Sequence, residues 1–460
     1  MFKGALIIGL LAGIMGGGQG YAYTATYPDE ASRAQFKTSL EAAPSLSIIY
    51  GEIDELPSPA GYMAYRTGMF LTVIASIWAL MAVIKLLRGQ EEDGRWEMIA
   101  SGSITSKEAS IQVFTGFMSA LSLAFILSVA GMSAIGILPE VNAPATAGTY
   151  LSLAIFVPAA LFASLGFFVS QLSITKRRAL FYGLIPLLIL LAFRTIGNTV
   201  SDLHWLKIYT PFGWTELSHP TVDPHMAWFI PVIVLFPFFT LFGRYLIGKR
   251  DLGAGIIPES STAKPHYSLL NSPIQLAFRQ NVVSFISWGI GILFLSALMA
   301  TISGIAASAV ADSESLKLAV AQLGGSDNIA IAFIGAGFVM VAMALLLMVT
   351  TGLGGVRKDE AKNQLDNILV QPVRRSSWLA GRLGLIAGTA TLVSLVCAVA
   401  TWAMAGTQNI SLDLGTLLLV SIALMGTIVF TLGFGAFLYG ILPRFAVIGM
   451  YLVIVWSFLI

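Results

Sequence analysis

Long apolar runs recur from one end of the 460-residue sequence to the other. Each run is long enough to cross a membrane, because a helix rises ~1.5 Å per residue and the hydrocarbon layer is ~30 Å thick. The runs are continuous and lack the polar alternation that marks membrane β-barrels. They predict eleven membrane-spanning helices, near residues 4–22, 63–87, 109–133, 150–172, 179–199, 227–243, 283–305, 329–353, 379–404, 414–438 and 446–460.

The composition agrees with this pattern. Hydrophobic residues make up 56% of the chain and charged residues only 11%, whereas soluble domains carry about a quarter charged residues. The predicted fold class is therefore an all-α polytopic membrane protein. The single cysteine, Cys397, lies inside an apolar run, so the sequence offers no disulfide and no thiolate metal site.

A segment between the second and third predicted spans occurs twice. It reads KLLRGQEEDGRWEMIASGSITSKEA at residues 85–109, and GGVRKDEAKNQLDNILVQPVRRSSW at residues 354–378, an offset of 269 positions. An even number of spans per half gives both halves the same orientation. The chain is expected to hold two parallel six-helix pseudo-repeats, the second with only five spans seen. The expected parts are a first transmembrane half, a cytoplasmic linker and a second half that is truncated, at residues 1–250, 251–272 and 273–460.

Each copy of this segment predicts a short helix with one apolar stripe. Trp96, Ile99 and Ala100 have the i, i+3, i+4 spacing of one helix face, and Leu365, Ile368 and Leu369 repeat it. Such a helix cannot cross the bilayer, so it is expected at the water boundary, where it could dock another protein. A solvated amphipathic loop without a partner is the simpler alternative. The recurrence of the same stripe and the same acids in both halves favours docking.

The distribution of basic residues predicts the orientation. If the N-terminus is cytoplasmic, most of the 26 Lys and Arg residues fall on the inner side, as the positive-inside rule requires. Both docking segments are then cytoplasmic. Lys3 and the apolar run 5–15 could instead form a signal peptide, although no clean small-x-small cleavage site follows. The glycines of the string MGGGQG, residues 15–20, are interpreted as the end of the first span.

Motifs for catalysis are missing from the sequence. No G-x-x-x-x-G-K-[ST] phosphate loop, H-E-x-x-H or G-x-S-x-G occurs. His204, His219 and His225 have a spacing that matches no metal motif, so no metal site is predicted. The chain is therefore not expected to be an enzyme, and no catalytic residues are assigned.

One pair of polar residues lies within a predicted span. Arg194 is near the end of span 179–199, and Asn198 follows one turn later. A charge at mid-bilayer costs at least ~2.5 kcal/mol on insertion scales, so the pair could line a substrate path. The simpler interpretation is that Arg194 reaches toward the lipid headgroups, with Asp202 as its partner.

The repeated segment also carries a resemblance. The string RGQEEDGRWEMIASGSITS, from Arg88, resembles the cytoplasmic segment of ABC-2-type permeases, in the branch of polyketide antibiotic and multidrug exporters. The second copy keeps several of the same residues but has Asn363 and Gln364 where the family has Gly-Arg. GKRDLGAGIIP, residues 248–258, is also similar to this family. The resemblance implies an ATPase-coupling role for Arg88, Glu91, Glu92, Arg95, Trp96, Glu97, Ile99, Arg357, Glu360, Leu365, Asp366, Ile368, Pro372 and Arg374.

The resemblance implies a function as well as a fold. It implies the permease subunit of an ABC exporter in a bacterial cytoplasmic membrane, moving a bulky hydrophobic compound outward. Two copies of a separate ABC ATPase subunit would bind ATP and Mg²⁺, so this chain itself is expected to bind no cofactor and no nucleic acid. The alternative is a secondary transporter driven by an ion gradient, but no Asp or Glu lies inside a predicted span. A lipid-modifying membrane enzyme would need a nucleophile or metal set that the sequence lacks.

Overall fold

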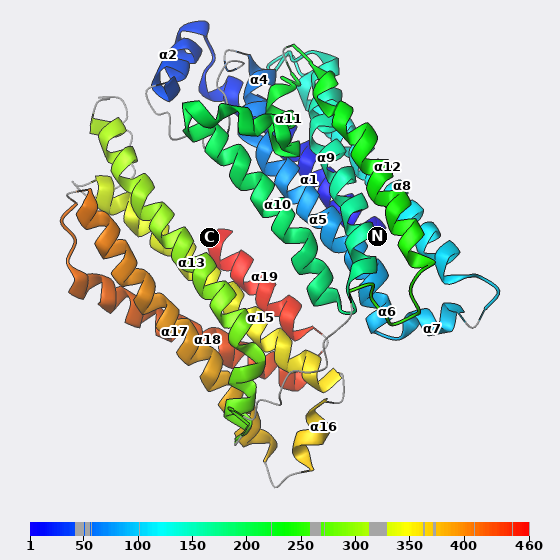
Figure 1. Cartoon of the computed structure of the whole chain (residues 1–460). Coiled ribbons are helices and arrows are strands. Elements are labelled where there is room, and N and C mark those ends of the chain that lie inside the picture. The colour runs from blue at the N-terminus through cyan, green and yellow to red at the C-terminus, as the bar shows by residue number, and fades with distance from the viewer. Residues whose placement is uncertain are drawn as a thin grey trace. The chain divides into compact units, whose positions relative to one another are not determined.

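The computed structural model is helical and contains no strand in the part of the chain that it describes (Figure 1). That part comprises residues 1–41, 50, 56, 58–100, 102–221, 223–257, 268–270, 272–311, 329–361, 364–370, 374–408, 410–443 and 445–459. Ten of these helices are long and apolar enough to cross a membrane. The all-α polytopic fold class is thus confirmed. The eleventh predicted run, residues 446–460, contains α19 (Ala446–Leu459), a helix of 14 residues.

The chain divides into two compact units, Met1–Ala263 and Lys264–Ile460. The helices of the first unit are α1 (Phe2–Thr26), α2 (Glu30–Glu41), α4 (Pro59–Met63), α5 (Met69–Ile84), α6 (Gln90–Glu92), α7 (Arg95–Ala100), α8 (Ser106–Gly136), α9 (Ala145–Leu172), α10 (Lys176–Thr199), α11 (Pro211–Leu217) and α12 (Ile230–Ile247). The helices of the second unit are α13 (Pro273–Ala311), α15 (Ile329–Ala361), α16 (Gln364–Leu369), α17 (Arg375–Thr407), α18 (Leu414–Ile441) and α19.

The sequence repeat reappears in the helix boundaries. Adding 269 to the bounds of α7 gives those of α16, and adding it to α9 gives α18. Within the first unit, α9 packs against α5, α8, α10 and α12, and α1 lies along α8. Within the second unit, α18 packs against α15 and α17, and α13 packs against α17. The same succession of long helix, short helix and long helix therefore occurs in each unit.

Glycines let α1 and α8 approach closely. Gly16, Gly17 and Gly20 are buried, and α1 continues to Thr26. The prediction that these glycines end the first span is therefore wrong. A side chain on Gly131 of α8 would lie 2.7 Å from the Cα of Gly13. Small residues at such crossings let helix backbones meet, which is a common basis of helix association in membranes.

Leucine at Gly9 is expected to force these helices apart. A Cβ there would lie 2.6 Å from the carbonyl oxygen of Ala124, a backbone atom that cannot move aside alone. Overpacking of this kind costs about 1–3 kcal/mol or more. Thermal unfolding in detergent should show the loss for Gly9→Leu. Gly18→Leu, on the same helix, is the control because a Cβ on Gly18 meets nothing within 4 Å. Equal stability of the two variants would contradict this packing.

Candidate functional site

The first repeated segment folds as a short helix between two long ones. After α6 the chain turns at Gly94, whose φ of +74° suits a residue without a Cβ. α7 follows over six residues. α8 then begins at Thr105, whose hydroxyl accepts from the N–H of Glu108 while the Glu108 carboxylate accepts from Thr105, a capping box. Gly94 thus precedes the start of α7, and the capping box marks the start of α8.

The described side chains of the two apolar stripes face the interior of their own units. Trp96 is 5% exposed and belongs to the first unit's core. Leu365 is buried and Ile368 packs against the second unit's core. These three side chains therefore anchor the short helices, where the sequence had suggested a docking surface. The side chains of Ile99, Ala100 and Leu369, and all of Pro372, lie outside the described residues.

The outward faces carry charged side chains and, on α7, an exposed methionine. Arg95, Glu97 and Met98 of α7 are exposed, as is Asp366 of α16, the repeat partner of Glu97. Arg95 donates to Gln90 at 2.8 Å. A surface for a partner is thus available on each short helix, and it includes an exposed acid at the same repeat position. The structure does not test the coupling role itself, which stays a prediction.

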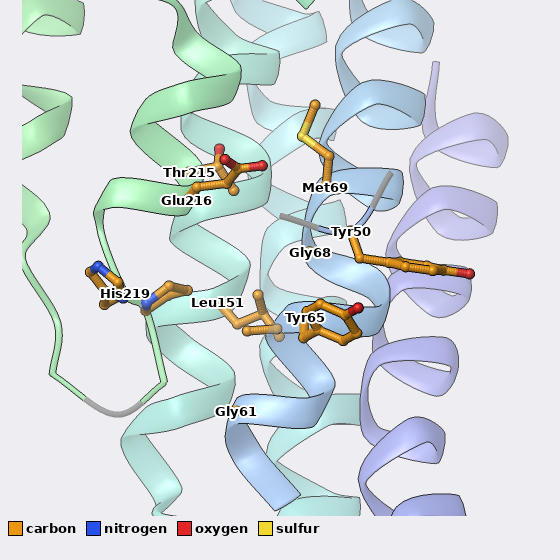
Figure 2. A pocket seen from close by; sticks show the side chains of 11 residues that line it. Tyr50, Gly61, Tyr65, Gly68, Met69, Leu151, Thr215, Glu216 and His219 are labelled. Atoms are coloured by element: carbon orange, nitrogen blue, oxygen red, sulfur yellow. The ribbon is translucent and has the colours of Figure 1, made fainter. Parts of the chain in front are cut away.

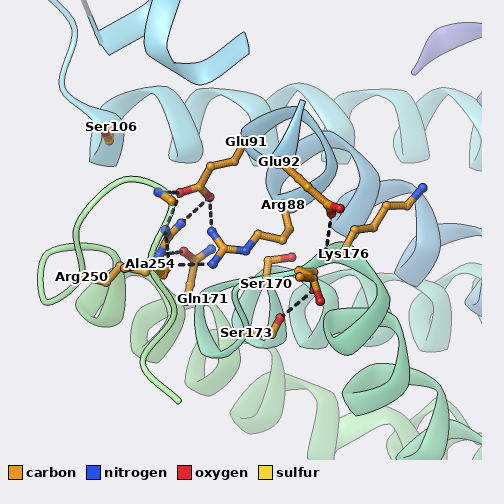
Figure 3. Close-up of polar contacts among 12 residues, drawn as sticks. Arg88, Glu91, Glu92, Ser106, Ser170, Gln171, Ser173, Lys176, Arg250 and Ala254 are labelled. Atoms are coloured by element: carbon orange, nitrogen blue, oxygen red, sulfur yellow. Dashed lines mark hydrogen bonds and ion pairs between the residues drawn. The ribbon is translucent and has the colours of Figure 1, made fainter. Parts of the chain in front are cut away.

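Glu91 lies at the centre of a buried charge network (Figure 3). Arg250 donates to both of its carboxylate oxygens, at 2.6 and 2.9 Å. Arg88, only 1% exposed, pairs with the same carboxylate at 2.7 Å. Nearby, Glu92 accepts from the backbone N–H of Lys176 at 2.9 Å. Charge-assisted bidentate pairs of this kind are the stronger class of hydrogen bond, so Glu91 holds its segment to the rest of the first unit.

The second segment has its own network. Arg357 pairs with Glu360 at 2.9 Å, and the hydroxyl of Tyr439 in α18 donates to the same carboxylate at 2.6 Å. Arg382 of α17 pairs with Asp359 at 2.5 Å. Arg374 is exposed at the start of α17. In both units, the repeated acid is therefore bonded to another part of its own unit.

Arg194 and Asn198 belong to a second buried cluster. Arg194 is 2% exposed and pairs with Glu216 of α11, and the Asn198 amide donates to that carboxylate at 3.1 Å. The Lys207 ammonium, fully buried, lies 3.8 Å from it. The favoured interpretation, an arginine reaching headgroups beside Asp202, is not what the structure shows, since Arg194 is buried.

Local sequence places Glu216 there. Thr210 caps α11 by accepting from the N–H of Gly213, and Pro211 occupies the first turn. A Cβ on Gly213 would lie 2.1 Å from the carbonyl oxygen of Lys207, so glycine permits the close approach of α11 to the preceding turn. Glu216 then lines a cavity of about 50 Å³ together with Tyr65 and His219 (Figure 2).

Comparison with known proteins finds similarity to membrane permeases, the class that the repeated segment had suggested. Residues 270–460 match the family model described as "Multidrug efflux system permease Rv1217c, C-terminal domain". The chain is also 28% identical over 378 residues to the multidrug efflux system permease protein Rv1217c of Mycobacterium tuberculosis, covering 81% of this chain and 67% of that protein. The chain is a relative of multidrug efflux permeases. The recognition of an exporter permease from the repeated segment is thereby confirmed.

The chain also contains apolar cavities. In the first unit, α8, α9 and α12 line an open surface cavity of about 710 Å³, whose lining includes Met118, Phe125, Phe156, Met226 and Phe236. In the second unit a cavity of about 530 Å³ lies between α15 and α18. Asp413 lies at its edge, and hydrogen bonds from the hydroxyl and backbone N–H of Thr416 hold the pKa of that carboxyl below its usual range.

The described residues contain no group of three His, Cys, Asp or Glu side chains that could hold a metal ion. Sequence reasoning missed the partners of its own candidates, namely Arg250 for Glu91, Glu216 for Arg194 and Asn198, and Tyr439 for Glu360. Arg250 was visible only as a basic residue after a predicted span, and nothing in the sequence assigned it a partner.

Proposed function

We propose that this permease is the membrane subunit of an ATP-driven ABC exporter. Two copies of a separate ATPase subunit would bind ATP and Mg²⁺ and dock on α7 and α16. The observation that carries the proposal is the repetition of one design: each unit holds a six-residue helix at the same repeat position, anchored by Trp96 or Leu365, with an exposed acid at Glu97 or Asp366. The sequence has no phosphate-binding loop of its own, so an ATP-driven mechanism would need the ATPase of another chain.

The transport step follows from this arrangement. A transporter needs two conformations that ATP and cargo favour differently. Closure of the two ATPase subunits would displace α7 and α16, which are joined to long helices on both sides. The charged faces suit a polar partner surface, because electrostatic complementarity directs association and fixes register. The cargo proposed is a bulky hydrophobic compound, since the cavity of about 710 Å³ is lined by aromatic and methionine side chains.

We place the permease in a bacterial cytoplasmic membrane with its N-terminus in the cytoplasm. The positive-inside distribution of Lys and Arg supports this orientation, and it puts both short helices on the side where ATP is available. An ionophore distinguishes this proposal from the ion-gradient alternative in proteoliposomes that contain the permease and its ATPase. It would abolish gradient-driven transport and leave an ATP-driven exporter active.

Reversing both exposed acids is expected to detach the ATPase. The double variant Glu97→Arg/Asp366→Arg places like charge against whatever basic groups bind these acids, and each ~1.4 kcal/mol lost weakens binding tenfold. Co-purification with the partner ATPase, and dye-stimulated ATP hydrolysis in proteoliposomes, should both fall on the order of tenfold or more.

The matched control is Glu140→Arg, an exposed acid beyond the other end of α8. It should leave both measurements unchanged. Wild-type ATPase association in the double variant would refute docking on these helices.

A further inference from the structure

The chain that leaves α12 turns back over the repeated segment. We call residues 250–257 the strap. Its shape depends on two glycines: Gly253 has φ +81°, and a Cβ on Gly255 would lie 2.7 Å from the backbone carbonyl carbon of Ser173. Only glycine fits both conditions without strain. The strap is therefore a specified element that follows α12.

The strap encloses the carboxylate of Glu91. Besides the two bonds from the Arg250 guanidinium, the backbone N–H of Gly253 donates to the same carboxylate at 2.8 Å. Arg88 in turn donates to the carbonyl oxygen of Ala254 at 2.6 Å. Two residues of the repeated segment are thus bonded to three residues of the strap, with side chains and backbone both taking part (Figure 3).

The strap is also bonded to the end of α9. Ile256 and Ile257 donate backbone N–H groups to the carbonyl oxygens of Gln171 and Leu172, at 3.3 and 2.9 Å. The Arg250 Nε donates to the Gln171 side chain at 2.9 Å. Arg250 therefore joins three elements at once: α6 through Glu91, α9 through Gln171, and α12 through its own backbone.

Apolar packing between α7 and the strap is incomplete. A cavity of about 180 Å³ lies there, lined by Trp96, Ser106, Gln171, Arg250 and Leu252. Its lining is largely polar and charged side chains, so the two walls do not interlock as a packed core would. A displacement of α7 toward the strap would meet this space first. The ion pair of Glu91 with Arg250 is accordingly the charged connection between the two, beside the bonds of Gly253 to Glu91 and of Arg88 to Ala254.

We propose that Arg250 is a positioning residue of the transport cycle, which makes α6 and α7 move together with the ends of α9 and α12. The inference rests on the proposed function, because it requires a partner that displaces α7. α9 and α12 line the apolar cavity of the first unit. The strap would therefore carry motion from the ATPase contact to the helices around the cargo, in addition to the covalent path through α5 and α8.

The test is Arg250→Gln in the full permease reconstituted with its ATPase. Glu91 keeps its bond to Arg88, and the exposed face of α7 is untouched, so the complex should assemble with its basal ATP hydrolysis intact. Stimulation by ethidium or Nile red, whichever the wild-type complex exports, should fall on the order of tenfold or more, as for typical coupling energies. Arg250→Lys keeps the charge without the two-oxygen geometry and should recover part of the stimulation.

Full stimulation in an assembled Arg250→Gln complex would overturn the proposal. If that variant does not fold, spin labels at Asp93→Cys, between α6 and α7, and at Lys249→Cys decide in a chain that keeps Arg250, with Cys397→Ala removing the single native thiol. An unchanged distance between the labels with and without ATP supports one moving body, and separation of the labels overturns it. Loss of ATPase binding by Glu97→Arg/Asp366→Arg tests docking separately, so the two ideas can fail independently.

Discussion

Replacing Glu216 with alanine is expected to lower the free energy of unfolding of the permease by about 3–5 kcal/mol, the range for breaking a buried ion pair from one side. Glu216 is the carboxylate between Arg194 and Lys207, and these cations are 2% and 0% exposed. Without it, two buried cations lose their carboxylate partner, and the Asn198 amide loses an acceptor. Desolvated charges without a partner are among the most destabilising changes in a protein.

Thermal unfolding in detergent, followed by tryptophan fluorescence, measures this effect. Glu216→Gln keeps the size and an acceptor oxygen but removes the charge, so it should lose nearly as much stability as the alanine variant. Adding Lys207→Met to Glu216→Gln removes one of the two cations and should recover part of the loss. Glu140→Ala, an exposed acid, should have no measurable effect. Wild-type stability of Glu216→Ala would show that the cluster does not hold α11 in place.

The helices of this permease were predictable because their signals are local. Continuous apolar runs indicate spans without any knowledge of contacts, and all ten long helices lie on predicted runs. The repeat was equally visible, since α9 and α18 have the same bounds after the 269-residue shift. The glycines of α1 were misinterpreted for the opposite reason. A glycine run indicates a helix end only if no neighbouring helix needs the space, and here α8 does.

The candidate site was predictable in position but not in orientation. The spacing of Trp96, Ile99 and Ala100 indicates that α7 has an apolar face, but the same spacing suits a partner surface and the protein's own core. Burial of Trp96 decides for the core. The ion-pair partner of Glu91 could not be predicted from the sequence for a related reason. Glu91 and Arg250 are 159 positions apart, and many arginines in the sequence could have met that acid. Arg250 meets Glu91 because the strap folds back over the repeated segment.

The burial of Glu91 separates its role from that of Glu97, six residues later on the same segment. Glu91→Lys should destabilise the permease by about 3–5 kcal/mol, because a third cation would join Arg88 and Arg250 at 1% and 10% exposure. The N–H of Gly253 would also lose its acceptor. Glu97→Lys changes the charge by the same amount at an exposed position, where substitutions usually stay within ~0.5 kcal/mol.

The unfolding temperature should therefore respond to the substitution at Glu91, and ATPase binding to the substitution at Glu97. Glu91→Lys is expected to lower the unfolding temperature, and Glu97→Lys to leave it unchanged while weakening co-purification of the ATPase. The paired variant Glu91→Lys/Arg250→Glu restores opposite charges and should regain part of the lost stability, since the two groups are in direct contact and their effects are not additive. If Glu91→Lys unfolds at the wild-type temperature, the carboxylate is not the structural centre that its bonds to Arg88, Arg250 and Gly253 imply.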